Sequence, residues 1–176
     1  GPWYANSWKI MLLTGLRPGE CYGLRTSDIK DGMLHVCRAI DPQRNITDGK
    51  TKNARRSIYL PDIAIPIIED QLRQIKKLQT DILFPNLGGE LAYSSCTYRS
   101  WKRFATANGI DVPLYSLRHT HATIMESKLS LGDLKAAMGH AESMDTVSTY
   151  VHETPEQKLR TAKVVDITFR DLLHAE

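Results

Sequence analysis

Apolar side chains recur at helical spacing along much of the chain, and one shorter stretch alternates instead. Residues 4–14 have the spacing of a helix, and Gly15 is suited to end it because glycine adopts the left-handed conformation of a helix end. Pro18 suits the first turn of a second helix, which we expect to reach about Leu24. Arg17 would then lie at the junction of two helices, close to an N-terminus whose amides favour anions.

Alternation of apolar and polar residues predicts a strand at about 33–40 and an antiparallel partner at 55–60. Residues 41–51 between them are polar and are predicted to form a loop. We therefore expect a β-hairpin that carries Lys50 in its connecting segment.

The rest of the chain is predicted to be helical. Helices are expected at about 66–78, 94–109, 116–128, 131–138, 143–150 and 155–163. Ser94 or Ser95 would cap the second of these. Its apolar side would place Tyr98, Trp101 and Phe104 in the core. The predicted fold class is α+β, a mostly helical domain with a small antiparallel sheet in its N-terminal third.

Composition is that of an ordinary soluble domain and leaves the partner open. The 176 residues are 41% hydrophobic and 24% charged, which suits one domain with a sizeable core. The net charge of +3 permits a polyanionic partner but does not require one. Basic residues form two clusters, Lys50, Lys52, Arg55 and Arg56 in one, and Arg99, Lys102 and Arg103 in the other. Taken alone, each cluster is as often a solvated surface as a binding face.

Several classes of site are disfavoured. Cys21, Cys37 and Cys96 are widely spaced, which argues against a disulfide framework or a zinc site and suits a reducing interior. His119 and His121 lack the i, i+4 spacing that places two metal ligands on one helix face. No apolar run approaches the ~20 residues of a membrane span. We expect no metal, no cofactor and no membrane association.

Five short motifs present polar residues that could act together on a phosphate diester. They are Thr14-Gly15-Leu16-Arg17-Pro18-Gly19-Glu20, Gly49-Lys50-Thr51-Lys52, Ser116-Leu117-Arg118-His119-Thr120-His121, Met138-Gly139-His140 and Ser148-Thr149-Tyr150-Val151-His152. Each has a plain structural explanation when judged singly. Arg17 could pair with Glu20, and Tyr150 could pack in the core. All of these explanations would have to hold together for the motifs to share no function.

In this order and spacing, the motifs resemble the catalytic domain of the tyrosine recombinases of the phage-integrase type, over most of the chain. That family has a Thr-Gly-Leu-Arg-x-Gly-Glu block, a hairpin lysine, a His-x-Leu-Arg-His-Thr block, a Leu-Gly-His turn and then a tyrosine. The resemblance implies site-specific recombination of double-stranded DNA, such as integration and excision of a phage or mobile element. Cleavage and rejoining would pass through a covalent 3′-phosphotyrosyl intermediate, in the cytoplasm of a bacterium.

The resemblance assigns roles to two arginines and the late tyrosine. Arg17 and Arg118 would clamp the non-bridging oxygens of the scissile phosphate, a task that suits planar guanidinium groups. Tyr150 would be the nucleophile. A phenol has a pKa of ~10, so nearby cations would have to favour its anion.

Two further positions complete the implied chemistry. Lys50 would protonate the departing 5′ oxygen from its place on the hairpin, and Lys52 is the alternative if Lys50 is not the hairpin lysine. His140 would hydrogen-bond the phosphate or help to position the proton.

One position departs from the family pattern. The family has histidine three residues before the second arginine, where this chain has Tyr115. A phenolic hydroxyl can donate a hydrogen bond to phosphate, but it does not exchange protons near neutral pH as imidazole does. We therefore expect Tyr115 to contact phosphate only. His119 is a different position and is expected to bond within the domain.

Contacts with DNA and with other protomers are expected outside this centre. The residues expected to face DNA are Lys52, Arg55, Arg99, Lys102 and Arg103. The tail after residue 154 is expected to help form a tetramer on DNA, with packing on its own domain as the alternative.

Residues 3–176 are expected to form one catalytic domain of a longer protein whose N-terminal DNA-binding domains lie outside this chain. Gly1-Pro2 is typical of the residues left when a purification tag is removed. Two other functions stay open. One is relaxation of DNA in the manner of a type IB topoisomerase. The other is a DNA-binding module whose active site has decayed, of which Tyr115 would be the first sign.

Overall fold

The computed structural model describes residues 1–48, 55–139 and 154–174. Its α-helices there are α1 (Ala5–Thr14), α2 (Pro18–Tyr22), α3 (Ile65–Ile75), α4 (Ser94–Ala107), α5 (Ser116–Glu126), α6 (Leu131–Met138) and α7 (Pro155–Leu173). Its strands are β1 (Ile29–Lys30), β2 (Met33–Val36), β3 (Arg38–Ile40), β4 (Ile46–Asp48) and β5 (Arg56–Tyr59), and its 3-10 turns are η1 (Thr26–Asp28), η3 (Asp62–Ala64) and η4 (Lys76–Leu78). The predicted fold class, mostly helical with small antiparallel sheets, is confirmed.

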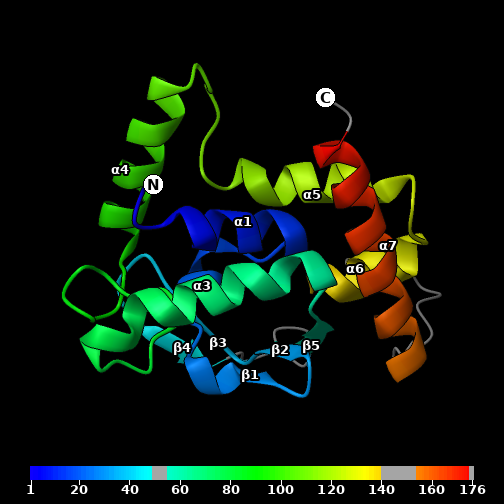
Figure 1. Cartoon of the computed structure of the whole chain (residues 1–176), viewed down its shortest axis with the longest axis horizontal. Coiled ribbons are helices and arrows are strands. Elements are labelled where there is room, and N and C mark those ends of the chain that lie inside the picture. The colour runs from blue at the N-terminus through cyan, green and yellow to red at the C-terminus, as the bar shows by residue number, and fades with distance from the viewer. Residues whose placement is uncertain (49–54, 140–153, 175–176) are drawn as a thin grey trace.

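Helix α1 lies at the centre of the domain. It runs between α5 and α3, with the strands on one side and α4 and α7 near its two ends (Figure 1). Seven of its ten residues are buried, because other elements cover it on several sides. Even Asn6 and Ser7 are buried, and each is hydrogen-bonded, Asn6 to Gln71 and Ser7 to Tyr22.

Aromatic residues join α4 to this centre. The ring of Trp8 lies 5.2 Å from Trp101 and 5.0 Å from Phe104, measured between ring centroids. These contacts confirm Trp101 and Phe104 as residues that pack on the core. The prediction for Tyr98 is wrong, because 40% of this residue is exposed. It lies on the edge of the helix, where the apolar spacing alone does not distinguish core from surface.

The junction between α1 and α2 follows the sequence closely. Gly15 ends α1 in the left-handed region, with φ of 66°, and its amide donates to the Met11 carbonyl at 2.9 Å. Pro18 is the first residue of α2, as predicted. Gly19 allows α2 to touch the backbone of β3, since a Cβ atom there would lie 2.4 Å from the Ile40 carbonyl oxygen.

The strands differ from the prediction in one respect. Segment 33–40 is two strands, because β2 pairs with β5 and β1 whereas β3 pairs with β4. The predicted pairing with 55–60 is confirmed in the register Met33↔Tyr59 to Val36↔Arg56. The segment 41–51, predicted to be a loop, contains strand β4. Ile46, the apolar residue of this strand, is 44% exposed, so the strand lacks the alternation of buried and exposed residues by which a sequence signals a strand.

Two helix ends also differ. The expected serine cap of α4 is wrong, because Tyr93 is the N-cap and Ser94 is already the first helical residue. Helix α7 continues to Leu173, ten residues beyond the predicted end at 163. The helix predicted at 143–150 lies outside the described residues.

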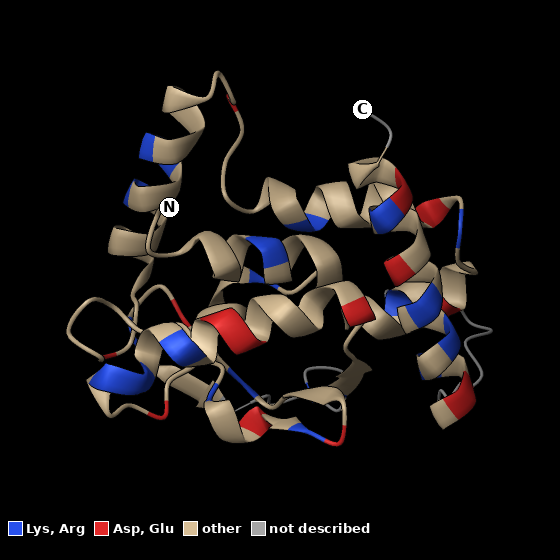
Figure 2. Ribbon diagram, viewed as in Figure 1, with Lys and Arg blue, Asp and Glu red and all other residues tan. Residues whose placement is uncertain are grey.

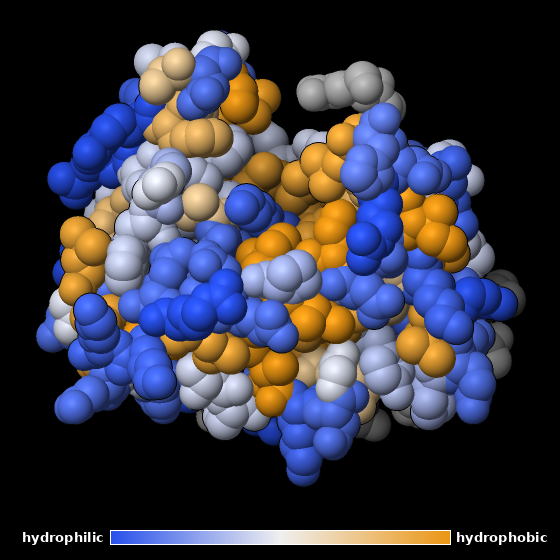
Figure 3. Space-filling view, viewed as in Figure 1, coloured by the Kyte–Doolittle hydropathy of each residue, from blue (hydrophilic) through white to orange (hydrophobic). Residues whose placement is uncertain are grey.

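Helix α7 packs on its own domain. Thr161, Ala162, Val165 and Phe169 form its buried side. The opposite side keeps apolar residues exposed, and hydrophobic residues gather in the centre of the face shown in Figure 3, beside α3 and α7. None of the described helices combines the length and the apolar composition needed to cross a bilayer.

Candidate active site

Arg17 is held at the junction of α1 and α2 by the turn that follows it. Its amide donates to Oε2 of Glu20 at 2.9 Å, and its Nη1 donates to Oε1 of the same carboxylate at 2.9 Å. Both Nη atoms also lie 3.3 Å from the carbonyl oxygen of Gly139. The side chain of Arg17 remains 38% exposed, so its partners do not enclose it fully.

Glu20 is the anionic centre of this cluster. Its carboxylate accepts two hydrogen bonds from Arg17 and two from Arg56, the latter at 3.0 and 2.9 Å. Burial opposes ionisation of Glu20, but the hydrogen bonds and the charge of Arg56, followed by those of Arg17, outweigh it and hold its pKa below the ordinary value. The pair between Arg17 and Glu20, the structural alternative considered for Arg17, therefore forms, and it is part of a larger cluster of charges.

Arg118 approaches the same place from α5. The residue is 2% exposed. Its Nη1 donates to the Gly15 carbonyl, and its Nη2 donates to the Met138 carbonyl at 2.9 Å. Burial lowers the pKa of Arg118 to about 10, and the charge of Arg17 adds to the effect. The two arginines predicted to clamp phosphate thus lie close enough to influence each other, although 101 positions separate them in the sequence.

The C-terminal end of α6 is where these side chains meet. Its last carbonyl oxygens lack partners within the helix, as at any helix end. Here three successive carbonyl oxygens each accept a hydrogen bond from a different arginine. Arg56 donates through Nε to Ala137 at 2.8 Å, Arg118 donates to Met138, and Arg17 donates to Gly139. The negative end of the helix dipole suits this concentration of positive charge.

A groove opens beside Arg17. It is lined on one side by residues of β3 and the segment after it, including Ile40 and Pro42, and on the other by Tyr98 and Tyr115. Tyr115 is half-buried at the start of α5, with its ring centroid 5.0 Å from that of His119. Tyr115 therefore borders the same groove as Arg17.

Four residues of the predicted site belong to segments outside the described part of the chain. They are Lys50, Lys52, His140 and Tyr150. Gly139 ends the described segment before His140, and Arg55 begins the described segment that follows Lys50 and Lys52.

Of the residues expected to face DNA, Arg55, Arg99, Lys102 and Arg103 lie in the described part of the chain, and Arg99 and Arg103 share a groove. Arg99 and Arg103 lie one helical turn apart on the exposed side of α4 and line a second groove with Trp3 and Phe104. Arg55 and Lys102 are exposed. Figure 2 shows basic residues along the outer side of α4, away from α6 and α7. Arg99 and Arg103 thus border a different groove from the one that Arg17 lines.

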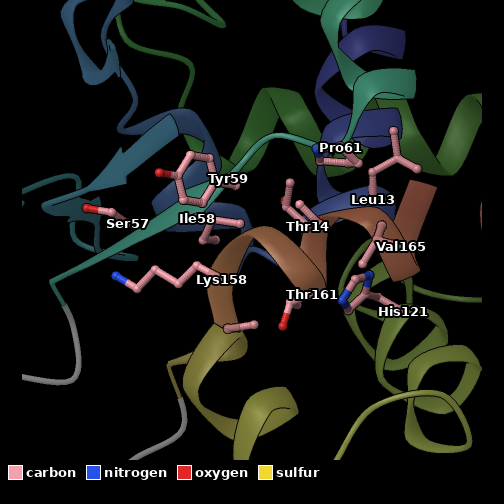
Figure 4. Close-up of a pocket in the computed structure, with 12 residues that line it drawn as sticks. Leu13, Thr14, Ser57, Ile58, Tyr59, Pro61, His121, Lys158, Thr161 and Val165 are labelled. Atoms are coloured by element: carbon pink, nitrogen blue, oxygen red, sulfur yellow. The ribbon is translucent and has the colours of Figure 1, made fainter. Parts of the chain in front are cut away.

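A small cavity lies where α7 meets the domain. Side chains from α1, β5, α5 and α7 face it, among them Thr14, His121 and Thr161 (Figure 4). His121 is buried, and its Nδ1 lies 2.8 Å from the Leu12 carbonyl. Burial lowers its pKa to about 4 despite that hydrogen bond. The neutral ring of His121 stacks on the ring of Phe169, so it helps α7 to pack on the domain.

One participant was missed by sequence reasoning. The sequence marks Arg56 as a member of a basic cluster and no more, yet its side chain is 8% exposed and bonds both Glu20 and α6. Its partners are 36 and 81 positions away, so no local pattern marks it. Among the described residues, no group of three or more His, Cys, Asp and Glu side chains is arranged to hold a metal ion.

Comparison with known proteins identifies the family of this fold and site. The family model described as "Phage integrase family" matches residues 3–157. The chain therefore belongs to the phage integrase family, whose members are tyrosine recombinases. It is 26% identical over 185 residues to the "Tyrosine recombinase XerC-like" protein of Caldanaerobacter subterraneus subsp. tengcongensis, which covers 89% of this chain and 47% of that protein. The chain spans about half the length of the curated relatives it matches.

Solved structures share the fold. The Tn1549 transposon integrase in complex with a circular intermediate DNA matches 90% of this chain and 57% of its own, with a TM-score of 0.68 and 20% identity. A lambda integrase tetramer bound to a Holliday junction matches 84% of this chain and 44% of its own, with a TM-score of 0.62 and 19% identity. At these identities the likeness establishes the architecture.

Proposed function

We propose that this chain is the catalytic domain of a site-specific DNA recombinase that integrates and excises a mobile element. The observation that carries the proposal is the convergence of Arg17 and Arg118 on the end of α6, directly before His140. Family membership supports the same conclusion. The DNA of such an element would lie in the cytoplasm of a bacterium.

The cluster has a charge that suits a phosphate diester. Three guanidinium groups and the Glu20 carboxylate leave two positive charges at the end of α6. A diester carries one negative charge and gains a second as the nucleophile adds to phosphorus. Positive groups fixed in advance around a developing charge stabilise it without reorganisation. Arg17, being partly exposed, would contact the non-bridging oxygens, and Arg118 would act from just beneath.

The proposed reaction exchanges one phosphate ester for another. Tyr150 would bond to phosphorus through its phenolic oxygen, and the bond from phosphorus to the 5′ oxygen would break. The phenol releases one proton to solvent, and Lys50, or Lys52 in its place, gives one to the 5′ oxygen; the lysine then regains a proton from solvent, so protons balance. His140 and Tyr115 would hydrogen-bond the phosphate. The reverse sequence with a new 5′ hydroxyl rejoins the strand.

The duplex would also be held by contacts to its backbone phosphates. Lys52 and Arg55, near the β4–β5 connection, and Arg99, Lys102 and Arg103 on α4 would meet backbone phosphates and position the duplex. Such contacts are electrostatic, so we expect binding by this chain to weaken as salt rises.

We also propose that α7 takes part in a tetramer on DNA. Its packing on its own domain leaves apolar side chains exposed, namely Leu159, Ile167, Leu172 and Leu173. Replacing Ile167 and Leu173, which are 60% and 67% exposed, by serine should weaken assembly on DNA and leave the fold intact. Unchanged assembly, measured by light scattering of the DNA complex, would remove this part of the proposal.

A trapping assay tests the proposed chemistry. The substrate is a pool of duplexes with randomised sequence and a nick close to the cleavage region, so that the short 5′-hydroxyl fragment diffuses away after cleavage. We expect a covalent complex of protein and DNA that survives denaturing electrophoresis. Tyr150→Phe should abolish it, and Tyr59→Phe, at a tyrosine outside the site, should not.

The same assay separates the alternatives. A binding module with a decayed site gives no covalent complex. A topoisomerase forms the complex and relaxes a supercoiled plasmid in the absence of exchange between two sites, whereas a recombinase joins strands from two different duplexes.

A further inference from the structure

Arg56 belongs to the active-site cluster without facing the groove. Its side chain is 8% exposed, and three of its nitrogen atoms are bonded inside the protein. Nη1 and Nη2 grip the two oxygens of Glu20 at 3.0 and 2.9 Å, and Nε donates to the Ala137 carbonyl at 2.8 Å. A guanidinium used in this way is a brace between two elements and has no surface to offer a ligand.

The brace determines where Arg17 lies. Nη1 of Arg17 has two partners, Oε1 of Glu20 and the carbonyl oxygen of Gly139. Arg56 holds both of them, Glu20 directly and the end of α6 through Ala137, two residues before Gly139. An arginine side chain that is 38% exposed keeps many rotamers unless its partners are fixed.

The same residue links the cluster to a second part of the proposed chemistry. Arg56 opens β5 and pairs with Val36 of β2 at the end of that ladder. The chain that precedes β5 is the connection that carries Lys50. Arg56 therefore links the start of β5, where this connection ends, to Glu20 on α2 and to the end of α6 through hydrogen bonds.

We propose that Arg56 is a positioning residue, which fixes Arg17 for phosphate by bracing Glu20 and the end of α6. The proposal rests on the proposed function in that it takes Arg17 as a phosphate clamp. Displacement of a catalytic group by an ångström can cost about 100-fold in rate. Loss of the brace should therefore slow chemistry far more than it weakens DNA binding.

One test needs no DNA. Rotation about the Nε–Cζ bond of an arginine, measured by NMR, is slow when both Nη atoms are hydrogen-bonded and fast when they are free. We expect slow rotation for Arg17 in the wild-type chain and fast rotation in Arg56→Gln. Arg73→Gln is the matched control, because Arg73 is 69% exposed and pairs only with Asp70 on the same helix. Slow rotation of Arg17 in a folded Arg56→Gln protein would overturn the proposal.

A second test uses the nicked duplex pool at saturating protein. Arg56→Gln should form the covalent complex about 100-fold more slowly, with DNA affinity nearly unchanged. Equal losses of rate and affinity, or no loss of rate, would contradict positioning. If the wild-type chain forms no covalent complex, the proposed function fails, and the rotation of Arg17 still decides whether Arg56 positions it.

Arg56→Lys covers the case in which Arg56→Gln does not fold. Lysine keeps the positive charge beside Glu20 but cannot grip both carboxylate oxygens and reach Ala137 together. We expect it to fold, to release Arg17 and to slow trapping in the same direction. A lysine variant that matches the wild type in both measurements would overturn the proposal.

Discussion

Replacement of Glu20 by glutamine is the most informative single perturbation of the cluster. Glutamine has nearly the shape of glutamate, so packing at this buried position is kept. The negative charge is lost, and the amide nitrogen now faces a guanidinium in place of an acceptor. Arg17, Arg56 and Arg118 would then share a small region with no anion among the residues that bond them.

The expected loss of stability follows from the burial of the pair. Removing one partner of a buried ion pair costs about 3–5 kcal/mol, because the other charge is left without compensation. Arg56 is 8% exposed and bears most of this cost, whereas Arg17 is 38% exposed and is screened by solvent. We therefore expect a loss near the lower limit, about 3 kcal/mol. For a domain of this size, that corresponds to a fall in Tm of about 6–12 °C.

The pH dependence gives a second, independent check. Because the folded protein lowers the pKa of Glu20, the stabilisation is present above the ordinary carboxyl pKa and is lost as pH falls through the folded value. The difference between wild type and Glu20→Gln should be constant near neutral pH and should shrink in acid.

Urea unfolding followed by circular dichroism measures both quantities. Glu69→Gln is the control, since Glu69 is exposed on α3. A loss below about 1 kcal/mol would be the size of a surface pair and would refute the reasoning, as would a difference that stays constant down to the lowest pH at which the protein folds.

Two further predictions concern the support of the site. Burial lowers the pKa of His121 from 6.5 to about 4, so the unfolded chain binds a proton there at a higher pH than the folded protein does. We therefore expect the free energy of unfolding of the wild type to fall by about 3 kcal/mol as pH is lowered from 6.5 to 4. Denaturant unfolding at several pH values checks this: His121→Gln should flatten the dependence of stability on pH over that range, and an unchanged dependence in the folded variant would contradict the prediction. Gly19→Ala should cost about 1–3 kcal/mol because its Cβ would meet the Ile40 carbonyl. Gly132→Ala in α6, whose Cβ would make an ordinary contact of 3.9 Å with Oγ of Ser130, should instead stabilise the fold by about a few tenths of a kcal/mol. Thermal unfolding of both variants checks this prediction, and a change of Tm in the same direction for the two would contradict it.

Much of the fold can be predicted from the local sequence pattern, and the exceptions are caused by contacts between segments distant in the sequence. The turn at Gly15 and the start of α2 at Pro18 depend on backbone properties of single residues, so they can be read from the chain. The division of segment 33–40 depends on which strand each half pairs with, and no local signal encodes that choice. Helix α7 extends through β-branched residues such as Val164 and Val165, because packing on the domain overrides their weak helix propensity.

The candidate site was predictable where motifs mark it and hidden where geometry alone defines it. Arg17 and Arg118 lie within recognisable motifs, and the structure brings them to one helix end. Arg56 has no motif of its own, since its role depends on Glu20 and Ala137, which only the folded chain brings near it. Tyr98 has the spacing of a core residue yet borders the groove beside Arg17, because burial depends on where α4 meets its neighbours.

Mass spectrometry of the trapped complex tests the central claim most directly. After nuclease and trypsin digestion, cleavage at Lys135 and Lys158 leaves residues 136–158 as a peptide that contains one tyrosine, Tyr150. The account predicts that this peptide carries the mass of a nucleotide remnant. A remnant on the peptide 104–118, which contains Tyr115, or no covalent complex from a folded protein that binds DNA, would contradict it.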